Sequence, residues 1–279
     1  MFGFVRWLLG NRFLPEFILA FIVGALSVLP AFLIWSNLSG LDRNFLLMQQ
    51  NTYRDEFFQY VPRAREVFDG HFPPAGVYAN ESNISPLNPI PPLFFSFFLR
   101  LFGGEVNPAY LSAQFFFTAL IFLLFFTLGL VLFRSRAFSL FFSLVGTLTQ
   151  IPQLLFRYYD RDYLSVLFKK FIPIIRTPLD KMYFARIDDP MLTFPFLLAA
   201  LISLYIFWLK PRISTGVLAG FFSGLLAYVY LHYFLFIAVF MGVILLLVWR
   251  VDACKINFKT GFVVVLTFFS VLIPYFINY

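Results

Sequence analysis

Charged residues are scarce in this 279-residue sequence, making up 13% of it, against about 25% in an average soluble domain. The hydrophobic fraction is 61%, and the mean hydropathy is +0.83. With so few polar residues, a single water-soluble globule could not cover its apolar interior. The composition therefore excludes a soluble enzyme, a nucleic-acid-binding protein and a disordered chain as descriptions of the whole sequence. It predicts a protein whose solvent is a lipid bilayer.

Cysteine and intramembrane charge are almost absent. Cys254 is the single cysteine and has no partner for an internal disulfide. The long apolar runs contain only Glu16, at the edge of the first run, and His232, within a later one. Ion-coupled transporters and proton pumps need ionisable or helix-breaking groups at mid-membrane depth. Their scarcity argues against a pump.

Apolar runs, by contrast, are abundant, and they predict an all-α polytopic membrane protein with about seven spans in a single domain, 1–279. Five runs cover about residues 15–35, 111–133, 137–155, 191–209 and 261–277. A further segment, residues 216–249, would form about 51 Å of helix, against a hydrocarbon core of about 30 Å. Basic residues flank this segment on both sides. We therefore expect a hairpin of two spans that turns near residues 231–233.

The distribution of basic residues sets the expected orientation in the membrane. The short connections hold nine Lys or Arg and one acidic residue, Asp252. The two long connections, about residues 37–110 and 156–190, hold twelve residues of each sign. By the positive-inside rule, the N-terminus is cytoplasmic and both long loops are external to the plasma (inner) membrane. The net charge of +7 thus requires no nucleic-acid partner.

The first long loop contains a predicted interfacial helix over about residues 53–70, ended by Asp69-Gly70. Pro62 is expected to kink this helix or to mark a restart. The helical period puts apolar residues on one face and polar residues on the other. The apolar row is Phe57, Val61, Ala64 and Phe68, and the polar row is Asp55, Gln59, Arg63 and Glu66. From these residues alone, a solvated face of a membrane-surface helix is an equally good interpretation of the polar row.

A proline-rich segment and a second short helix follow. Residues 85–92 contain four prolines and are expected to be extended or turned rather than helical. The Phe-rich residues 93–102 are too few to span a bilayer, so we expect a short helix at the membrane surface, ended by Gly103-Gly104.

The order of these features resembles that of GT-C-fold glycosyltransferases that use polyprenyl-phosphate sugars. This group includes the dolichyl-phosphate-mannose protein mannosyltransferases and bacterial lipid-sugar transferases. The matching features, in order, are a first span, Asp55-Glu56, Ala64-Arg-Glu66, Asn88-Pro-Ile-Pro-Pro-Leu93, a short helix ending in Gly-Gly, and a span closed by arginines. The resemblance is strongest over residues 55–72 and 88–136 and extends more weakly to about residue 249.

The resemblance implies an inverting glycosyltransferase that moves a sugar from a polyprenyl-phosphate donor to an acceptor glycan, lipid or protein at the external face. It places Asp55 as the general base, with Glu56 as its neighbour. It places Tyr60, Arg63 and Arg65 in the substrate-binding part of the same helix, without assigning a phosphate contact to either arginine.

Further candidate residues lie beyond the second predicted span, and each has a plain alternative. Arg157 and Arg161 begin a basic loop that is either a clamp for phosphate or acceptor, or simply solvated. Asp188 and Asp189 fall where relatives have an acidic residue, although helix capping explains them equally well. His232 falls at a turn where relatives often have a basic residue, or is merely interfacial.

The cofactor and two rival functions stay open. Asp55, Glu56, Asp188 and Asp189 offer the oxygen ligands that a divalent cation prefers, but some relatives use a metal and others do not. A lipid or sugar transporter without chemistry is one rival. An inactive fragment or accessory subunit is the other, because the sequence stops at Tyr279 directly after an apolar run.

Overall fold

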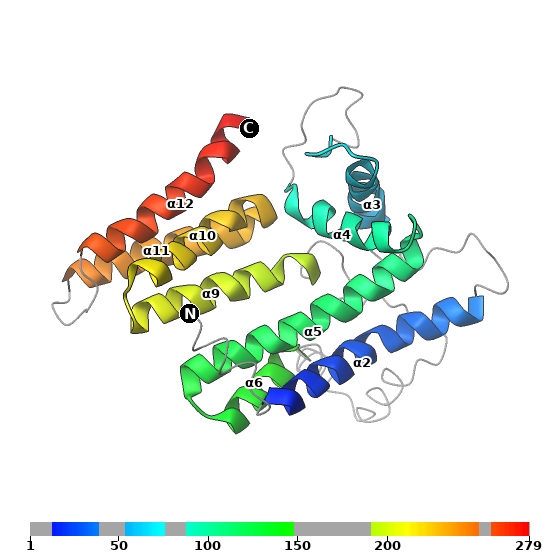
Figure 1. Ribbon diagram of the computed structural model, residues 1–279, viewed down its shortest axis with the longest axis horizontal. Helices are drawn as coiled ribbons and strands as arrows, with labels where there is room; N and C mark the ends of the chain where they lie inside the picture. The colour runs from blue at the N-terminus through cyan, green and yellow to red at the C-terminus, as the bar shows by residue number, and fades with distance from the viewer. Residues whose placement is uncertain (1–12, 39–53, 76–87, 148–190, 251–257, 279) are drawn as a thin grey trace, which may run out of the picture. The chain divides into compact units, whose positions relative to one another are not determined.

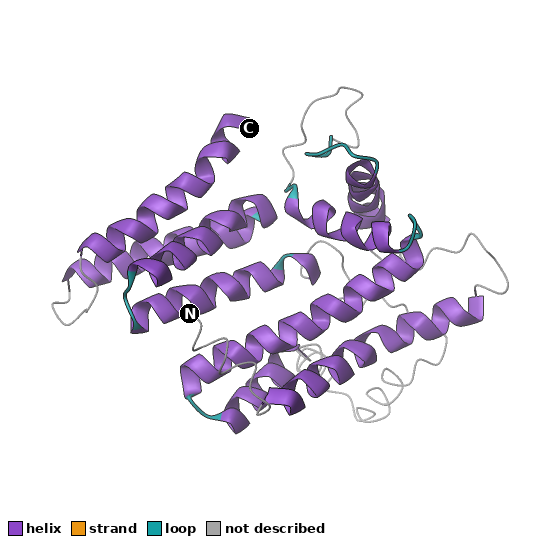
Figure 2. Cartoon of the chain, viewed as in Figure 1, coloured by secondary structure: helices purple, strands orange, loops and turns teal. Residues whose placement is uncertain are grey.

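The computed structural model describes residues 13–38, 54–75, 88–147, 191–250 and 258–278. Within these ranges the regular structure is helical and contains no β-strand (Figure 2). This confirms the all-α prediction. The chain divides into two compact units, and each unit combines two separate stretches of sequence. The first is Met1–Phe58 with Leu101–Met191, and the second is Gln59–Arg100 with Leu192–Tyr279.

The first unit is built around α2 (Leu14–Leu38), α5 (Val106–Phe133) and α6 (Arg136–Thr147), with α5 beside both other helices (Figure 1). Small residues let these helices approach closely, as is typical of helices packed in lipid. A Cβ on Gly24 of α2 would lie 2.8 Å from the carbonyl oxygen of Phe115 in α5. A Cβ on Gly129 would lie 2.9 Å from the Cα of Ser139 in α6.

An ion pair joins two helix starts in this unit. Arg136, the first residue of α6, donates through Nε and Nη2 to the carboxylate of Glu16, and the Nη2–Oε2 distance is 2.8 Å. The Glu16 side chain is 1% exposed, whereas that of Arg136 is 48% exposed. The pair therefore brings together two segments that the charge pattern assigns to the same side of the membrane.

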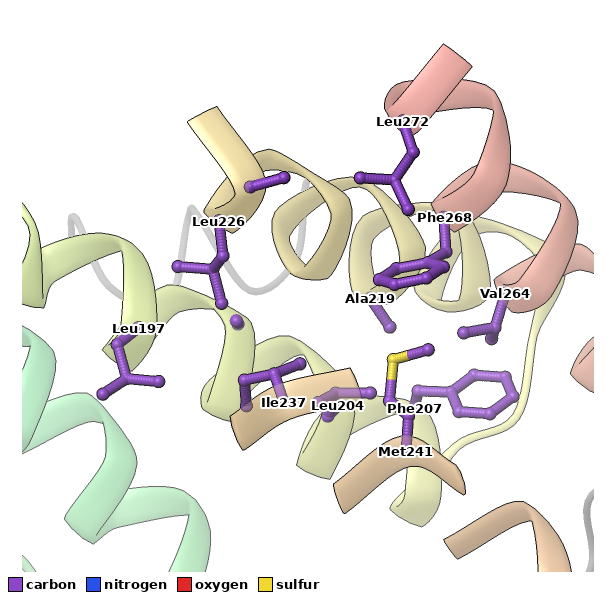
Figure 3. Packing of buried hydrophobic residues seen from close by; sticks show 12 residues of the cluster. Leu197, Leu204, Phe207, Ala219, Leu226, Ile237, Met241, Val264, Phe268 and Leu272 are labelled. Atoms are coloured by element: carbon purple, nitrogen blue, oxygen red, sulfur yellow. The ribbon is translucent and has the colours of Figure 1, made fainter. Parts of the chain in front are cut away.

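The second unit contains four apolar helices around one core. They are α9 (Phe194–Leu209), α10 (Ile213–Val229), α11 (Leu231–Arg250) and α12 (Phe258–Asn278). Phe207, Met241, Val264 and Phe268, which come from three of these helices, point toward one another in the core (Figure 3).

Residues 216–249 are divided between two helices, as expected. The backbone of Tyr230 is extended, with φ −162° and ψ 117°, and it separates α10 from α11. The break lies one residue before the predicted turn at residues 231–233. Figure 1 shows α11 running back along α10, and the two helices are in contact.

Three glycines set the contact between α10 and α12. A Cβ on Gly220 would lie 2.5 Å from the carbonyl oxygen of Val264, and one on Gly224 would lie 2.9 Å from that of Phe268. Gly216 faces the same helix. Tyr228 of α10 also donates to the Val271 carbonyl oxygen at 2.8 Å. This glycine stripe allows the two backbones to touch.

One described helix, α5, is long and apolar enough by itself to cross a membrane. The other apolar helical stretches within the described residues run from 10 to 17 residues, whereas a span needs about 20. Several boundaries differ from the sequence prediction by a few residues, most of all at α5, which begins at Val106 rather than at residue 111. α6 is described as far as Thr147, and the predicted end of this run at residue 155 lies outside the described residues.

Candidate functional site

Helix α3 (Arg54–Phe68) forms where the interfacial helix was predicted, and it ends as its sequence requires. Gly70 has φ +100°, a conformation that L side chains rarely adopt. The amides of Gly70 and His71 donate back to the carbonyl oxygens of Val67 and Glu66, at 3.2 and 2.9 Å. This pair of bonds is a Schellman motif, which satisfies the last carbonyls of the helix. The prediction that Asp69-Gly70 ends α3 is confirmed.

The helix is continuous across Pro62, so of the two alternatives expected there, a kink or a restart, the restart is excluded. The interpretation of the polar row as a solvated face does not hold for one of its members. Arg63 is 1% exposed, and its Nη2 donates to the carbonyl oxygen of Asn88 at 3.2 Å. Val61 and Ala64 of the apolar row are buried, and so is Val67 beside them. A second part of the chain therefore covers the face of α3 that carries Arg63.

That second part includes α4 (Ile90–Leu101), which begins earlier than predicted. Pro91 and Pro92 lie in its first turn, although the proline-rich segment was expected to be non-helical. The first-turn amides of a helix have no acceptor within the helix, so a proline there removes no helical hydrogen bond. The end of α4 was predicted correctly, because Gly103 and Gly104 follow it with φ of +61° and +91°.

Two more side-chain bonds hold this region together. Arg100, in the last turn of α4, donates through Nη2 to the carbonyl oxygen of Val67 at 3.0 Å. The Glu66 carboxylate accepts the amide of Ala75 at 2.6 Å, which folds residues 71–75 back against α3. We call the contacts of Arg63, Arg100 and Glu66 the α3–α4 clasp. In Figure 1, α3 is seen nearly end-on and crosses α4.

The remaining predicted residues of α3 have different environments. Arg65 is about half exposed, contacts the Asp69 carboxylate at 3.3 Å and lies over the Phe68 ring, 4.3 Å from its centroid. Tyr60 is partly buried. Asp55 and Glu56 lie in the first turn of α3, and their side chains are outside the described part of the structure.

The other predicted site residues lie far away in the sequence. His232 is exposed in the first turn of α11, and its ring contacts that of Tyr230 with centroids 5.2 Å apart. Arg157, Arg161, Asp188 and Asp189 lie outside the described residues. The described ranges contain no group of three or more His, Cys, Asp or Glu side chains that could hold a metal ion. A divalent cation therefore remains an expectation that depends in part on Asp188 and Asp189.

Sequence reasoning missed three features. Arg100 was seen only as a helix residue, although an arginine in the last turn of a helix next to another helix end is a candidate for binding its carbonyls. Gly216, Gly220 and Gly224 follow one another at intervals of four residues, which is a helix-contact motif that can be read from the sequence. The partner of Glu16 was also missed, although a carboxylate at the edge of an apolar run requires a nearby cation.

No protein-family model, curated protein or solved structure matches the chain.

Proposed function

We propose that this protein is a multi-pass membrane glycosyltransferase of the GT-C type, with about seven spans. It transfers a sugar from a polyprenyl-phosphate donor to an acceptor on the external face of the membrane. The observation on which the proposal rests is the α3–α4 clasp. The charged helix α3 is held against the proline-rich segment by the bond from the buried Arg63 side chain to the Asn88 carbonyl oxygen. These two stretches are the ones that resemble the family.

A bilayer around the apolar helices is supported by their exposed faces. α12 exposes large apolar side chains at helical spacing, and α2 does the same along most of its length. Soluble monomers rarely expose contiguous apolar patches larger than a few hundred Å². The α12 residues are Phe262, Leu266, Phe269, Ile273 and Ile277. These stripes favour lipid as the neighbour of both units.

In the proposed reaction, Asp55 accepts the proton of an acceptor hydroxyl as its oxygen attacks the anomeric carbon of the donor sugar. The bond from that carbon to the phosphate oxygen breaks, and the polyprenyl phosphate leaves with the bonding electrons. The configuration at the carbon is inverted. Basic residues of the external loops offset the charge that develops on the phosphate.

The first experiment is a transfer assay with the purified protein in vesicles, using a panel of polyprenyl-phosphate sugars and measuring release of polyprenyl phosphate. Transfer from at least one donor is expected. Absence of transfer from every donor, by protein that is correctly inserted, would contradict the proposal.

Orientation is tested separately. Single cysteines placed within residues 76–85 of a Cys254→Ser background should react with an impermeant thiol reagent from outside. A cysteine at Arg134 should be protected. Because residue 254 is replaced, the background is silent. The reverse pattern of labelling would put α3 in the cytoplasm and exclude a donor site on the external face.

A transporter is the second candidate, and two buried polar residues of α5 favour it. Gln114 and Thr118 are each 1% exposed and lie one turn apart. Gln114 Nε2 donates to the Ser27 carbonyl oxygen at 3.1 Å. Gln114 Oε1 and Thr118 Oγ1 have no hydrogen-bond partner among the described residues. Movement of a lipid-linked sugar across vesicles without hydrolysis or transfer would favour this function over the enzyme.

A further inference from the structure

The carbonyl group of Asn88 lies outside α4, two residues before the first helical residue, Ile90, and Asn88 is partly buried. The first helical bond of α4 runs from the amide of Leu93 to the carbonyl oxygen of Pro89, at 3.4 Å. The Asn88 oxygen is therefore not part of the hydrogen bonding of α4. A backbone carbonyl that is withdrawn from water needs a hydrogen-bond partner elsewhere.

Arg63 satisfies this acceptor from the middle of α3. Its Nη2 lies 3.2 Å from the Asn88 oxygen, and Arg63 is 1% exposed, so the donor is shielded from water. Hydrogen bonds from a charged donor are stronger than those between neutral groups. The buried guanidinium therefore ties α3 to the segment that leads into α4.

Arg100 makes the reverse contact from α4 to α3. The Val67 carbonyl oxygen already accepts the Gly70 amide at 3.2 Å, and it also accepts Arg100 Nη2 at 3.0 Å. Arg63 and Val67 are four residues apart, which is about one turn of α3. Both ends of α4 are thus tied to a single turn of α3. This fixes how far α3 can slide or rotate against α4.

We propose that Arg63 is a positioning residue, which acts on sugar transfer by holding α3 in register on α4 and does not itself bind the donor. The inference rests on the proposed function, in which Asp55 is the base. Asp55 belongs to the same helix, about two turns before Arg63. A slide or rotation of α3 would therefore displace Asp55 together with the helix. A displacement of about 1 Å at a catalytic group costs about 10²-fold in rate.

The test compares Arg63→Met, Arg63→Lys and the control Arg134→Met, which removes an exposed guanidinium from the turn after α5. Arg63→Met should lower kcat by about 10²-fold and leave the donor KM unchanged. Arg63→Lys should recover part of kcat, because its ammonium can still donate one bond to the Asn88 oxygen. The control should stay within about twofold of the parent, as exposed substitutions usually do.

Hydrogen exchange of the α3 and α4 amides gives a readout that does not need activity. Arg63→Met should speed exchange in both helices, and Arg134→Met should not. A higher donor KM at unchanged kcat would overturn the proposal, since it would make Arg63 a donor ligand. Exchange equal to that of the parent would overturn it as well. If the parent transfers no sugar from any donor, the proposed function fails, and the exchange rates alone decide whether the clasp exists.

Discussion

The α3–α4 pair and the α10–α12 pair are held together by opposite kinds of contact. In α3–α4, charged side chains bind backbone groups of the neighbouring element, as Arg63 does with Asn88 and Arg100 with Val67. In α10–α12, glycines bring two backbones into van der Waals contact, and Gly220 faces the Val264 carbonyl. If α10 and α12 lie in lipid, as we propose, there is no hydrophobic force between them, so close packing has to supply the attraction. In the same proposal α3 and α4 lie at the water boundary, where charged donors can take that part.

The difference indicates which contacts bear on the proposed reaction. Substitutions in α3–α4 should change the transfer rate more than they change the free energy of unfolding. Substitutions of the stripe glycines should lower the free energy of unfolding more than they change the transfer rate. The predictions below test that division, beginning with the largest effect.

Asp55→Asn should lower transfer by about 10²–10⁴-fold, because the amide keeps the shape of the carboxylate and cannot accept the proton. Stability should change little if Asp55 lies at the wet membrane surface. The measurement is the initial transfer rate at equal protein yield and equal melting temperature.

Glu56→Gln is the matched control for this variant. It should be milder than Asp55→Asn if Asp55 alone is the base. If the two carboxylates bind a metal, both variants should be equally inactive, and a chelator should abolish the activity of the parent. Transfer by Asp55→Asn within a few fold of the parent would remove the residue on which the mechanism depends.

Arg136→Met should give the largest loss of stability. It leaves the Glu16 carboxylate, 1% exposed, without its cation, and an uncompensated buried charge is strongly destabilising. Glu16→Gln should be milder, because Arg136 is 48% exposed and retains water as a partner. Thermal unfolding in the same detergent compares the two variants. Equal losses would mean that the burial of Glu16 does not determine the cost.

Gly220→Ala should destabilise the second unit by about 1–3 kcal/mol, as overpacking generally does. Its new Cβ would lie 2.5 Å from the Val264 carbonyl oxygen, so the α10 and α12 backbones must separate. Gly242→Ala is the control, because no atom lies within 4 Å of a Cβ at that position in α11. It should be neutral or stabilising by at most about 1 kcal/mol. Similar unfolding temperatures for the two variants would exclude the glycine stripe as a determinant of packing.

Much of the fold could be predicted because apolar runs and helix ends have local causes. The ends of α3 and α4 follow from Gly70 and from Gly103-Gly104, and the break at Tyr230 follows from the length of the segment and its flanking charges. The helix ends depend on neighbouring residues alone, and the break depends on one continuous segment and its flanks.

The contacts of the candidate site could not be predicted in the same way. Helical periodicity put Arg63 on a polar face, but it could not show that the start of α4, 25 residues away, covers that face. The pairing of Glu16 with Arg136 spans 120 residues. Contacts at such separations are decided by tertiary packing, which a single sequence does not display. Arg157, Arg161, Asp188 and Asp189 stay predictions.

The smallest effect is expected at Arg65, two residues from the buried Arg63. Its contact with Asp69 is an exposed i,i+4 pair, with side chains 52% and 48% exposed. Such pairs contribute about 0.2–1 kcal/mol, and salt screens them. Arg65→Met should therefore lower stability by no more than about 1 kcal/mol, and 1 M salt should reduce the difference from the parent.

Asp69→Asn is the control for that variant, because it breaks the same ion pair from the other side. The double variant should lose no more stability than either single one, apart from the contact of Arg65 with the Phe68 ring. The transfer kinetics of the two variants then distinguish the role of Arg65 from that of Arg63. The resemblance places Arg65 in the substrate-binding part of the helix. If Arg65 contacts the donor there, Arg65→Met raises the donor KM, whereas Arg63→Met lowers kcat. A fall in kcat for Arg65→Met as large as that for Arg63→Met would contradict the distinction between a buried clasp and a surface pair on one helix.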